Sequence, residues 1–180
     1  FRTDGEMIEK WEMPADKAES GARILPDIAA QVAEKLKKYY IAPEKVLGIG
    51  MGVPGPVKED GTVLRCVNLG WGVFNVEEEL SHLTGFKVKV GNDANVAALG
   101  EMWMGGGKGH KDLILVTLGT GIGGGVIING KMVYGNNGAA GEIGHIPVKD
   151  FEDEEERCGC GKRGCLEQYC SAKGFAHTTL

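Results

Sequence analysis

Apolar residues in the first part of the chain change from helical spacing to strand-like runs. They recur at helical spacing from Ser20 to Tyr40, which predicts an amphipathic helix with Ser20 as a candidate N-cap and Pro26 near its first turn. The apolar positions of this helix are Ile24, Leu25, Ile28, Ala29, Val32 and Leu36. Residues 45–57 then predict an apolar strand that runs into a Gly/Pro turn, and residues 62–71 predict a second extended segment.

The apolar pattern after residue 85 predicts one more helix and then a β-meander. Residues 86–107 read as a strand, a polar turn and a helix that stops at three consecutive glycines. Three strands at hairpin spacing follow, in residues 112–119, 123–130 and 131–135. The last two are joined by Asn129-Gly130, which suits a two-residue turn. Alternating helices and strands followed by a separate meander predict an α/β fold with two lobes that meet near residues 105–109.

Both ends of the chain read as parts of larger structural units. Residues 1–13 resemble the second and third strands of a meander whose first strand would lie upstream. Residues 170–180 resemble the start of a helix that has no partner. We therefore expect an α/β fold that is incomplete at both ends.

Composition and charge restrict the functions that the chain can have. Its 180 residues carry a formal net charge of -5, and 42% of them are hydrophobic, which suits one large domain or two small lobes with a real core. The acidic balance and the lack of a Lys/Arg-rich tract argue against nucleic-acid binding. No apolar run approaches the ~18 residues of a membrane span, and the N-terminus lacks signal-peptide features, so we expect a cytoplasmic protein. The acidic run Glu152–Glu156 is predicted to be a solvated loop.

One histidine and three clustered cysteines form the set of ligands that a structural zinc ion requires. They are His145, Cys158, Cys160 and Cys165. Clustered cysteines in a cytosolic protein favour metal over disulfides, although free or regulatory thiols are the alternative. A complete Cys₃His set leaves no open position for a catalytic water, so the zinc is expected to be structural. Cys66 and Cys170 lie apart from this cluster and are expected to be buried or inert thiols.

A glycine-rich segment, "VTLGTGIGGGV", lies between two predicted strands. The backbone N–H groups of Gly119, Thr120 and Gly121 could converge there on an anion. The segment is neither a Walker A loop nor a dinucleotide fingerprint, because no GK[ST] follows and the next element is a strand. A tight hairpin turn explains the same pattern.

Asn92 and Asp93 lie where a predicted strand meets a predicted helix. Both residue types are favoured N-caps, which is the simpler interpretation. The functional interpretation is that Asp93 is a general base that accepts a proton from a substrate hydroxyl while Asn92 orients the same substrate. The two interpretations are compatible. Glu142 and His145 form a second polar pair, which gains weight because the cysteine cluster follows it.

Six motifs together carry a family resemblance. They are "GVPGPV", "NLGW", "GNDANVAALGE", "LGTGIGGGVIINGK", "GAAGEIGH" and "CGCGKRGCLE". Their order and spacing, over about residues 46–170, resemble the ROK family of sugar kinases, open reading frames and transcriptional repressors. The resemblance implies an actin-like, ribonuclease-H-like two-lobed fold. Residues 1–107 would form an N-terminal α/β lobe without its first strand and first phosphate loop, and residues 108–180 the first part of a C-terminal lobe with the zinc loop.

The same resemblance implies a sugar site and a nucleotide site. Asp93 would be the base for the attacking sugar hydroxyl, and residues 119–121 would hold phosphate. The sugar would be bound by Asn92, Glu142, His145 and Glu167, with Gly55 and Asn68 lining the pocket. His145 would give one ring nitrogen to zinc and the other to the sugar, which is physically sensible because a partner on the second nitrogen fixes the tautomer and orientation of a metal-bound imidazole.

The activity implied is transfer of the γ-phosphate of Mg²⁺-ATP to the 6-hydroxyl of a hexose, with glucose favoured. Alternatives within the family are a fructose, mannose or N-acetylmannosamine kinase and a sugar-sensing module that binds without phosphorylating. A zinc-stabilised interaction module with no small-molecule role is a third hypothesis. The resemblance also suggests a homodimer. Because only part of the expected nucleotide site is present, the isolated chain is expected to be a poor kinase.

Overall fold

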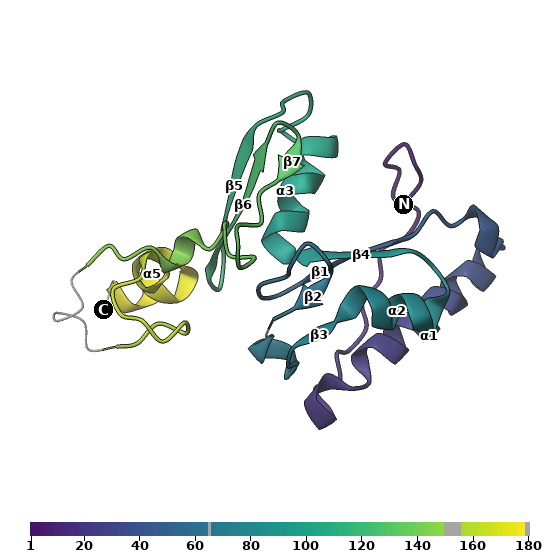
Figure 1. The fold of residues 1–180 in the computed structure, drawn as a ribbon, viewed down its shortest axis with the longest axis horizontal. Helices are drawn as coiled ribbons and strands as arrows, with labels where there is room; N and C mark the ends of the chain where they lie inside the picture. The colour runs from purple at the N-terminus through teal and green to yellow at the C-terminus, as the bar shows by residue number, and fades with distance from the viewer. Residues whose placement is uncertain (65, 150–155, 179–180) are drawn as a thin grey trace. The chain divides into compact units, whose positions relative to one another are not determined.

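The computed structural model describes residues 1–64, 66–149 and 156–178, and the chain divides into two compact units, Phe1–Asn92 and Asp93–Leu180 (Figure 1). Each unit combines helices with β-strands. The acidic run predicted as a solvated loop lies outside the described residues except for Glu156. Within the described ranges, no helix is long and apolar enough to cross a bilayer.

The first unit is built on a parallel pair of strands. β1 (Ile49–Val53) pairs with β4 (Val88–Asn92) along their whole lengths. The other elements are η1 (Ala18–Gly21), α1 (Ile24–Lys38), η2 (Pro43–Lys45), β2 (Thr62–Val63), η3 (Val67–Leu69), β3 (Phe74–Asn75) and α2 (Val76–Thr84). The connection from β1 to β4 contains α2, which is the arrangement that a parallel pair of strands requires. β2 and β3 form a short antiparallel pair within that connection.

An apolar core joins the helices and strands of the first unit. Its buried residues are Ile24, Leu25, Val53, Val57, Val63, Cys66, Trp71, Val76, Leu80, Val88 and Val90. Each fully buried side chain of the Val or Leu type stabilises the unit by about 1.5–3 kcal/mol. Cys66 lies buried in this core, as expected for a thiol outside the metal cluster. Asn75 caps α2, because its side-chain oxygen accepts a hydrogen bond from the Glu78 N–H at 3.0 Å.

The N-terminal segment does not form the strands that its sequence pattern predicts. The structure describes no strand in residues 1–17. Instead, Oε1 of Glu9 lies 2.9 Å from Nζ of both Lys35 and Lys38 on α1. Nζ of Lys35 also lies 4.8 Å from the ring centre of Trp11. The segment is therefore held by side-chain contacts with one helix and not by backbone pairing.

The prediction that Ser20 caps α1 is also wrong. The helix begins at Ile24, and Arg23 occupies the N-cap position without a side-chain capping bond. Ser20 lies in η1 with a φ of 58°, whereas an N-cap residue has an extended backbone.

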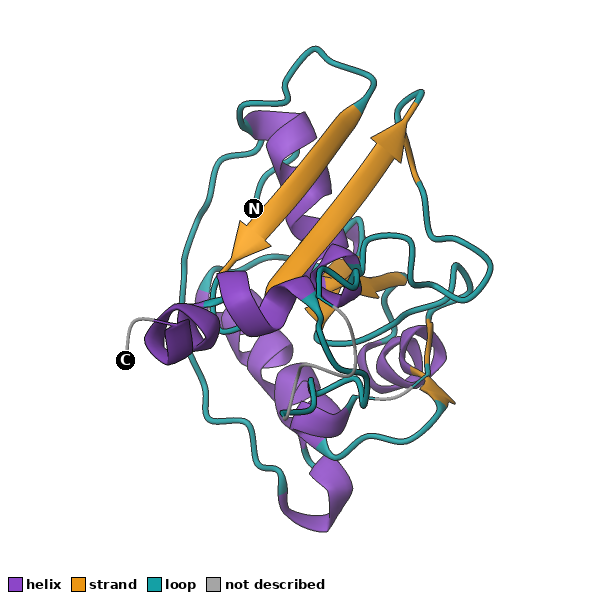
Figure 2. Ribbon diagram, turned by 90° about the vertical axis from the view of Figure 1, so that its left-hand side faces the viewer, coloured by secondary structure: helices purple, strands orange, loops and turns teal. Residues whose placement is uncertain are grey.

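The second unit pairs a helix with an antiparallel meander. β5 (Leu113–Leu118), β6 (Ile122–Ile128) and β7 (Lys131–Met132) lie in the order β5-β6-β7, and Figure 2 shows β5 and β6 as two long antiparallel strands. The other elements are α3 (Asp93–Met104), η4 (Ile143–His145), α4 (Leu166–Cys170) and α5 (Ala172–Thr178). The predicted meander is confirmed, including the turn at Asn129-Gly130, where both residues have positive φ.

Helix α3 belongs to the second unit because it packs on β5 and β6. A Cβ added to Gly125 of β6 would lie 2.6 Å from Cβ of Ala98, so glycine in the strand and alanine in the helix let the two backbones approach closely. The observed division between the units therefore falls before α3. The division expected from the sequence, after residue 107, placed this helix with the preceding strands.

Candidate functional site

The four predicted metal ligands lie together in the second unit. The ligand atoms of His145, Cys158, Cys160 and Cys165 all lie within 4.8 Å of one another. Sγ of Cys158 is 3.5 Å from Nδ1 of His145, and Sγ of Cys160 is 3.7 Å from Sγ of Cys165. A tetrahedral zinc ion with bonds of ~2.3 Å to sulfur and ~2.0 Å to nitrogen would place such atoms about 3.5 and about 3.8 Å apart. The donor set therefore fits zinc in its chemistry, and these two pairs already have the spacing of ligands on one ion.

Backbone pairing brings together the two ends of the segment that carries the four ligands, residues 145–165, which we call the metal loop. Pro147 and Cys165 form an isolated antiparallel bridge. The N–H of Leu166 donates to the carbonyl of Ile146 at 2.9 Å, and the N–H of Val148 donates to the carbonyl of Gly164 at 2.8 Å. These bonds set Cys165 beside the segment that follows His145, although the two ligands are far apart in sequence.

The thiols of this cluster hold their protons more tightly than ordinary cysteines, with one exception. Burial, with added effects from Cys160 and Cys158, raises the pKa of Cys165 to about 12. Burial also raises the pKa of Cys158. At Cys160 burial acts in the same direction, but the Lys162 N–H and the neighbouring thiols outweigh it and lower the pKa. A bound cation would favour the three thiolates, so metal binding would release protons.

His145 directs its two ring nitrogens to different groups. Nδ1 faces the Cys158 thiol, and Nε2 lies 3.7 Å from Oε2 of Glu142. His145 is the last residue of η4, and Glu142 comes directly before that turn. Both side chains are partly exposed, at 26% and 34%. This geometry is compatible with the predicted double role, in which one nitrogen binds metal and the other meets a sugar hydroxyl.

Glu167 makes a contact that the sequence did not indicate. Its Oε2 accepts a hydrogen bond from the N–H of Ile122 at 2.9 Å, and its Oε1 lies 3.8 Å from Sγ of Cys158. A Cβ at Gly121 would lie 2.5 Å from the same carboxylate. Glycine at this position leaves room for the carboxylate of Glu167, and it is the sequence signal that could have suggested this contact.

The glycine-rich segment forms a tight hairpin turn between β5 and β6. Leu118 pairs with Ile122, and the N–H of Gly119 donates to the carbonyl of Gly121 at 3.0 Å. The Gly119 N–H is thus used inside the turn. Of the three backbone groups predicted to hold phosphate, the one at Gly119 is therefore already paired.

In the first unit the structure brings Asn92 and Gly55 together. Nδ2 of Asn92 donates to the carbonyl of Gly55 at 3.2 Å. Asn68 lies in η3 and is exposed. Asp93 is the first residue of α3 in the second unit and is exposed, and its Oδ1 accepts a hydrogen bond from the Ala94 N–H at 2.8 Å. The carboxylate thus lies at the start of α3, but this bond to the next residue is not the bond to N2 or N3 that an N-cap side chain accepts.

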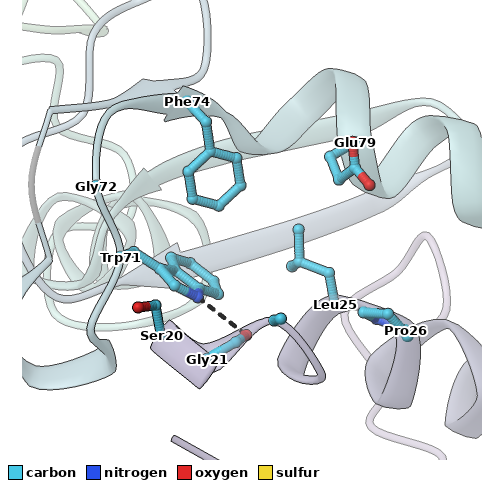
Figure 3. A pocket seen from close by; sticks show the side chains of 9 residues that line it. Ser20, Gly21, Leu25, Pro26, Trp71, Gly72, Phe74 and Glu79 are labelled. Atoms are coloured by element: carbon cyan, nitrogen blue, oxygen red, sulfur yellow. Dashed lines mark hydrogen bonds between the residues drawn. The ribbon is translucent and has the colours of Figure 1, made fainter. Parts of the chain in front are cut away.

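A hollow of about 350 Å³ in the first unit contains none of the predicted site residues (Figure 3). Its lining residues are Ser20, Gly21, Ala22, Leu25, Pro26, Trp71, Gly72, Phe74 and Glu79. The ring of Trp71 meets Phe74 edge to face, and its Nε1 donates to the Gly21 carbonyl at 3.2 Å. The hollow is an apolar groove between α1 and the connection that follows η3.

The fold and the Cys₃His cluster define an α/β protein with four candidate metal ligands gathered in its second unit. The chain belongs to the ROK family, whose sequence profile matches residues 2–180. It is 46% identical over 175 residues to a glucokinase of Halalkalibacterium halodurans, covering 97% of the chain and 52% of the relative. A putative xylose repressor of Caldicellulosiruptor is 38% identical over 172 residues, covering 95% of the chain and 42% of that protein.

A solved structure shares the fold. It is a ROK family glucokinase from Streptomyces griseus in complex with glucose and AMPPNP, 36% identical, with a TM-score of 0.78 over 98% of this chain and 54% of that one. The predicted fold class, an α/β fold of the actin-like ATPase type, is confirmed. The chain spans about half the length of the curated relatives it matches most strongly.

Proposed function

We propose that this chain is the sugar-binding part of an ATP-dependent hexose kinase for which glucose is the favoured substrate. The glucokinase relatives and the similar structure that holds glucose and AMPPNP support this activity. The observation that carries the proposal is the orientation of His145. One of its nitrogens faces the cysteines, and the other is directed to Glu142 and remains available to a hydroxyl.

Asp93 is the proposed general base. Its carboxylate takes the proton of the 6-hydroxyl while that oxygen forms a bond to the γ-phosphorus and the bond to ADP breaks. The exposure of Asp93 at the start of α3 supports this role, because a base must reach its substrate and the N-terminus of a helix favours negative charge. Mg²⁺ bound with ATP would neutralise charge on the phosphate oxygens.

Asn92, Glu142, His145 and Glu167 are proposed to bind the hexose hydroxyls, with Gly55 and Asn68 lining the pocket. Asn92, Gly55 and Asn68 come from the first unit, and the Asn92–Gly55 hydrogen bond supports a shared place in the site. The second unit contributes Glu142, His145 and Glu167. The zinc ion is proposed to be structural and to fix the orientation of His145, since all four of its positions are filled by protein ligands.

Three further proposals concern the whole protein. The phosphates of ATP bind at the turn of residues 119–121, where the backbone of Thr120 and Gly121 provides N–H donors. The protein works in the cytoplasm, where its thiols remain reduced and available to zinc. It forms a homodimer, which light scattering of the purified protein would measure.

Calorimetric titration of the zinc-loaded chain with glucose, fructose, mannose and N-acetylmannosamine tests the sugar site. A preference for glucose is expected. Tight binding of any one of these sugars, without phosphate transfer in a protein extended to the length of its relatives, would instead support a sugar-sensing regulator. The similarity to xylose repressors makes that the second candidate. Failure of a zinc-loaded, cooperatively melting chain to bind any hexose would favour the interaction module.

A further inference from the structure

Two hydrogen bonds join the segment after Cys165 to the two ends of the hairpin turn at residues 119–121. The Ile122 N–H, just after the turn, donates to Oε2 of Glu167 at 2.9 Å. The Ala172 N–H donates to the carbonyl of Gly119, at the start of the turn, at 2.8 Å. One short segment of chain therefore holds the turn at both of its ends.

That segment starts at a metal ligand. Cys165 is fully buried and directly precedes α4, which contains Glu167. Ala172 is the first residue of α5, separated from α4 by the buried Ser171. The position of both contacts is thus set by Cys165 and by the backbone bridge that pairs Cys165 with Pro147.

The other side of the metal loop packs on the same strand. A Cβ at Gly144, the neighbour of His145, would lie 2.9 Å from Cβ of Ile122. η4, which ends at His145, lies against β6 at this point. Because both the histidine side and the cysteine side of the metal loop contact the start of β6, the position of the turn depends on how the loop is closed.

We propose that the metal loop positions the turn of residues 119–121 through Glu167 and the Ala172 N–H, which makes both of them positioning residues for the phosphates bound there. The assignment of phosphates to this turn rests on the proposed function, whereas the coupling between metal loop and turn does not. Metal binding then organises the nucleotide side of the site as well as the sugar side. Glu167 acts by accepting a backbone hydrogen bond, a role separate from sugar recognition.

Matched variants separate these effects at Glu167. Glu167→Ala removes the acceptor for the Ile122 N–H. Glu167→Gln keeps a side-chain oxygen that can accept the same hydrogen bond while it removes the negative charge. Both variants retain all four metal ligands, so the zinc content of each can be verified before the measurement.

A second pair of variants tests the other hydrogen bond. Ala172→Pro removes only the donor, because proline is tolerated at the first position of a helix and the exposed Ala172 side chain leaves room for the ring. Ser171 has φ of -80° and ψ of 169°, the extended backbone that a residue before proline prefers. Ala172→Ser is the control, because it retains the N–H.

The readout is hydrogen exchange of individual amides in the zinc-loaded chain at neutral pH. Exchange at Ile122 should be faster by about tenfold or more in Glu167→Ala and should change by less than about threefold in Glu167→Gln. Exchange in the turn should accelerate in Ala172→Pro and not in Ala172→Ser. Amides in the middle of β5 and β6 should remain protected in all four variants.

Unchanged exchange at Ile122 in zinc-loaded Glu167→Ala would overturn the proposal, and so would unchanged exchange in the turn of Ala172→Pro. If Glu167→Ala binds less zinc, the comparison of Ala172→Pro with Ala172→Ser decides whether the proposal holds. The hydrogen bond from Ala172 to Gly119 involves no neighbour of a metal ligand. A chain that shows the predicted exchange but binds no hexose would remove the kinase proposal and leave the coupling. A working kinase whose variants show unchanged exchange would support the kinase proposal and remove the coupling.

Discussion

Nδ1 of His145 lies 3.5 Å from Sγ of Cys158, the separation expected of two ligands on one tetrahedral zinc ion. The opposite ring nitrogen is directed to Glu142. Closure of the metal loop therefore determines the direction of a proposed sugar ligand. It also determines the position of Glu167, which bonds to the start of β6.

Removal of one thiol should abolish stable zinc binding. Cys158→Ser leaves three ligands and should weaken zinc affinity by more than about a hundredfold, with a lower melting temperature as a consequence. Cys170→Ser is the matched control, because Cys170 is half-buried and lies outside the cluster. Zinc content by atomic emission and thermal melting measure both variants. Equal zinc content in the two would rule out Cys158 as a ligand.

Zinc should be released as the pH falls. The pKa of Cys165 in the metal-free chain is raised to about 12, so this thiol loses a proton when zinc binds and regains it when zinc leaves. Each proton released on binding weakens zinc affinity by about tenfold for every unit of pH decrease. Competition with a chromophoric chelator from pH 8 to pH 6 measures the slope. A flat profile would contradict the assignment of thiolate ligands.

Neutralising Glu9 should loosen the N-terminal segment. Hydrogen bonds, first with Lys38 and then with Lys35, lower the pKa of Glu9 to about 2 from an ordinary value of 4.5. Its contribution to stability is therefore complete above pH 4.5 and is lost as the pH falls towards 2. Glu9→Gln should lower the melting temperature at pH 7 and lose its effect near pH 2. The exposed Glu12 provides the control variant Glu12→Gln, which should match the unmodified chain at both pH values.

Gly125→Ala should destabilise the second unit by about 1–3 kcal/mol, because the added methyl group would meet Cβ of Ala98 at 2.6 Å and the Ala94 carbonyl at 3.0 Å. Gly100→Ala, on the exposed side of α3 with nothing within 4 Å of the new Cβ, should stabilise it by about 0.5–1 kcal/mol. Urea denaturation of the two variants measures these opposite signs. Equal free energies of unfolding would show that α3 does not pack on β6 this closely.

Asp93→Asn should abolish phosphate transfer and leave sugar binding intact. Asparagine retains the oxygen that accepts the Ala94 N–H, so the start of α3 is preserved while the base is lost. The rate of transfer should fall by about 10²–10⁴ in a protein of full family length. A coupled assay for ADP measures transfer, and calorimetry measures the sugar. Retained transfer would assign the base to another residue.

The features that the sequence predicted well are those encoded by residues close together in the chain. The Cys₃His set follows from ligand types at short spacing, and the β6–β7 turn follows from Asn129-Gly130, because backbone torsions there depend on the residues themselves. The start of α1 was misplaced because Ser20, a residue typical of caps, adopts a left-handed backbone in η1. The preference of serine for the N-cap position was overridden because the chain makes the turn of η1 before α1 begins.

The contacts that the sequence did not predict join residues far apart along the chain. Glu167 and Ile122 are 45 residues apart, and the bond uses a backbone N–H, which every residue except proline carries. No residue type at position 122 could have indicated it. The packing of α3 on β6 has no local signal for a similar reason, since it depends on small residues far apart in the chain that permit close approach.

The close approach of Glu167 to Gly121 has an evolutionary consequence. A side chain at position 121 would occupy the space of the carboxylate, so alanine there would move the Glu167 carboxylate away from the Ile122 N–H unless the hairpin shifted. The two positions should therefore covary across related proteins. Relatives with an acidic residue at position 167 should have glycine at position 121. Relatives with a shorter residue at position 167 should also accept other residues at position 121.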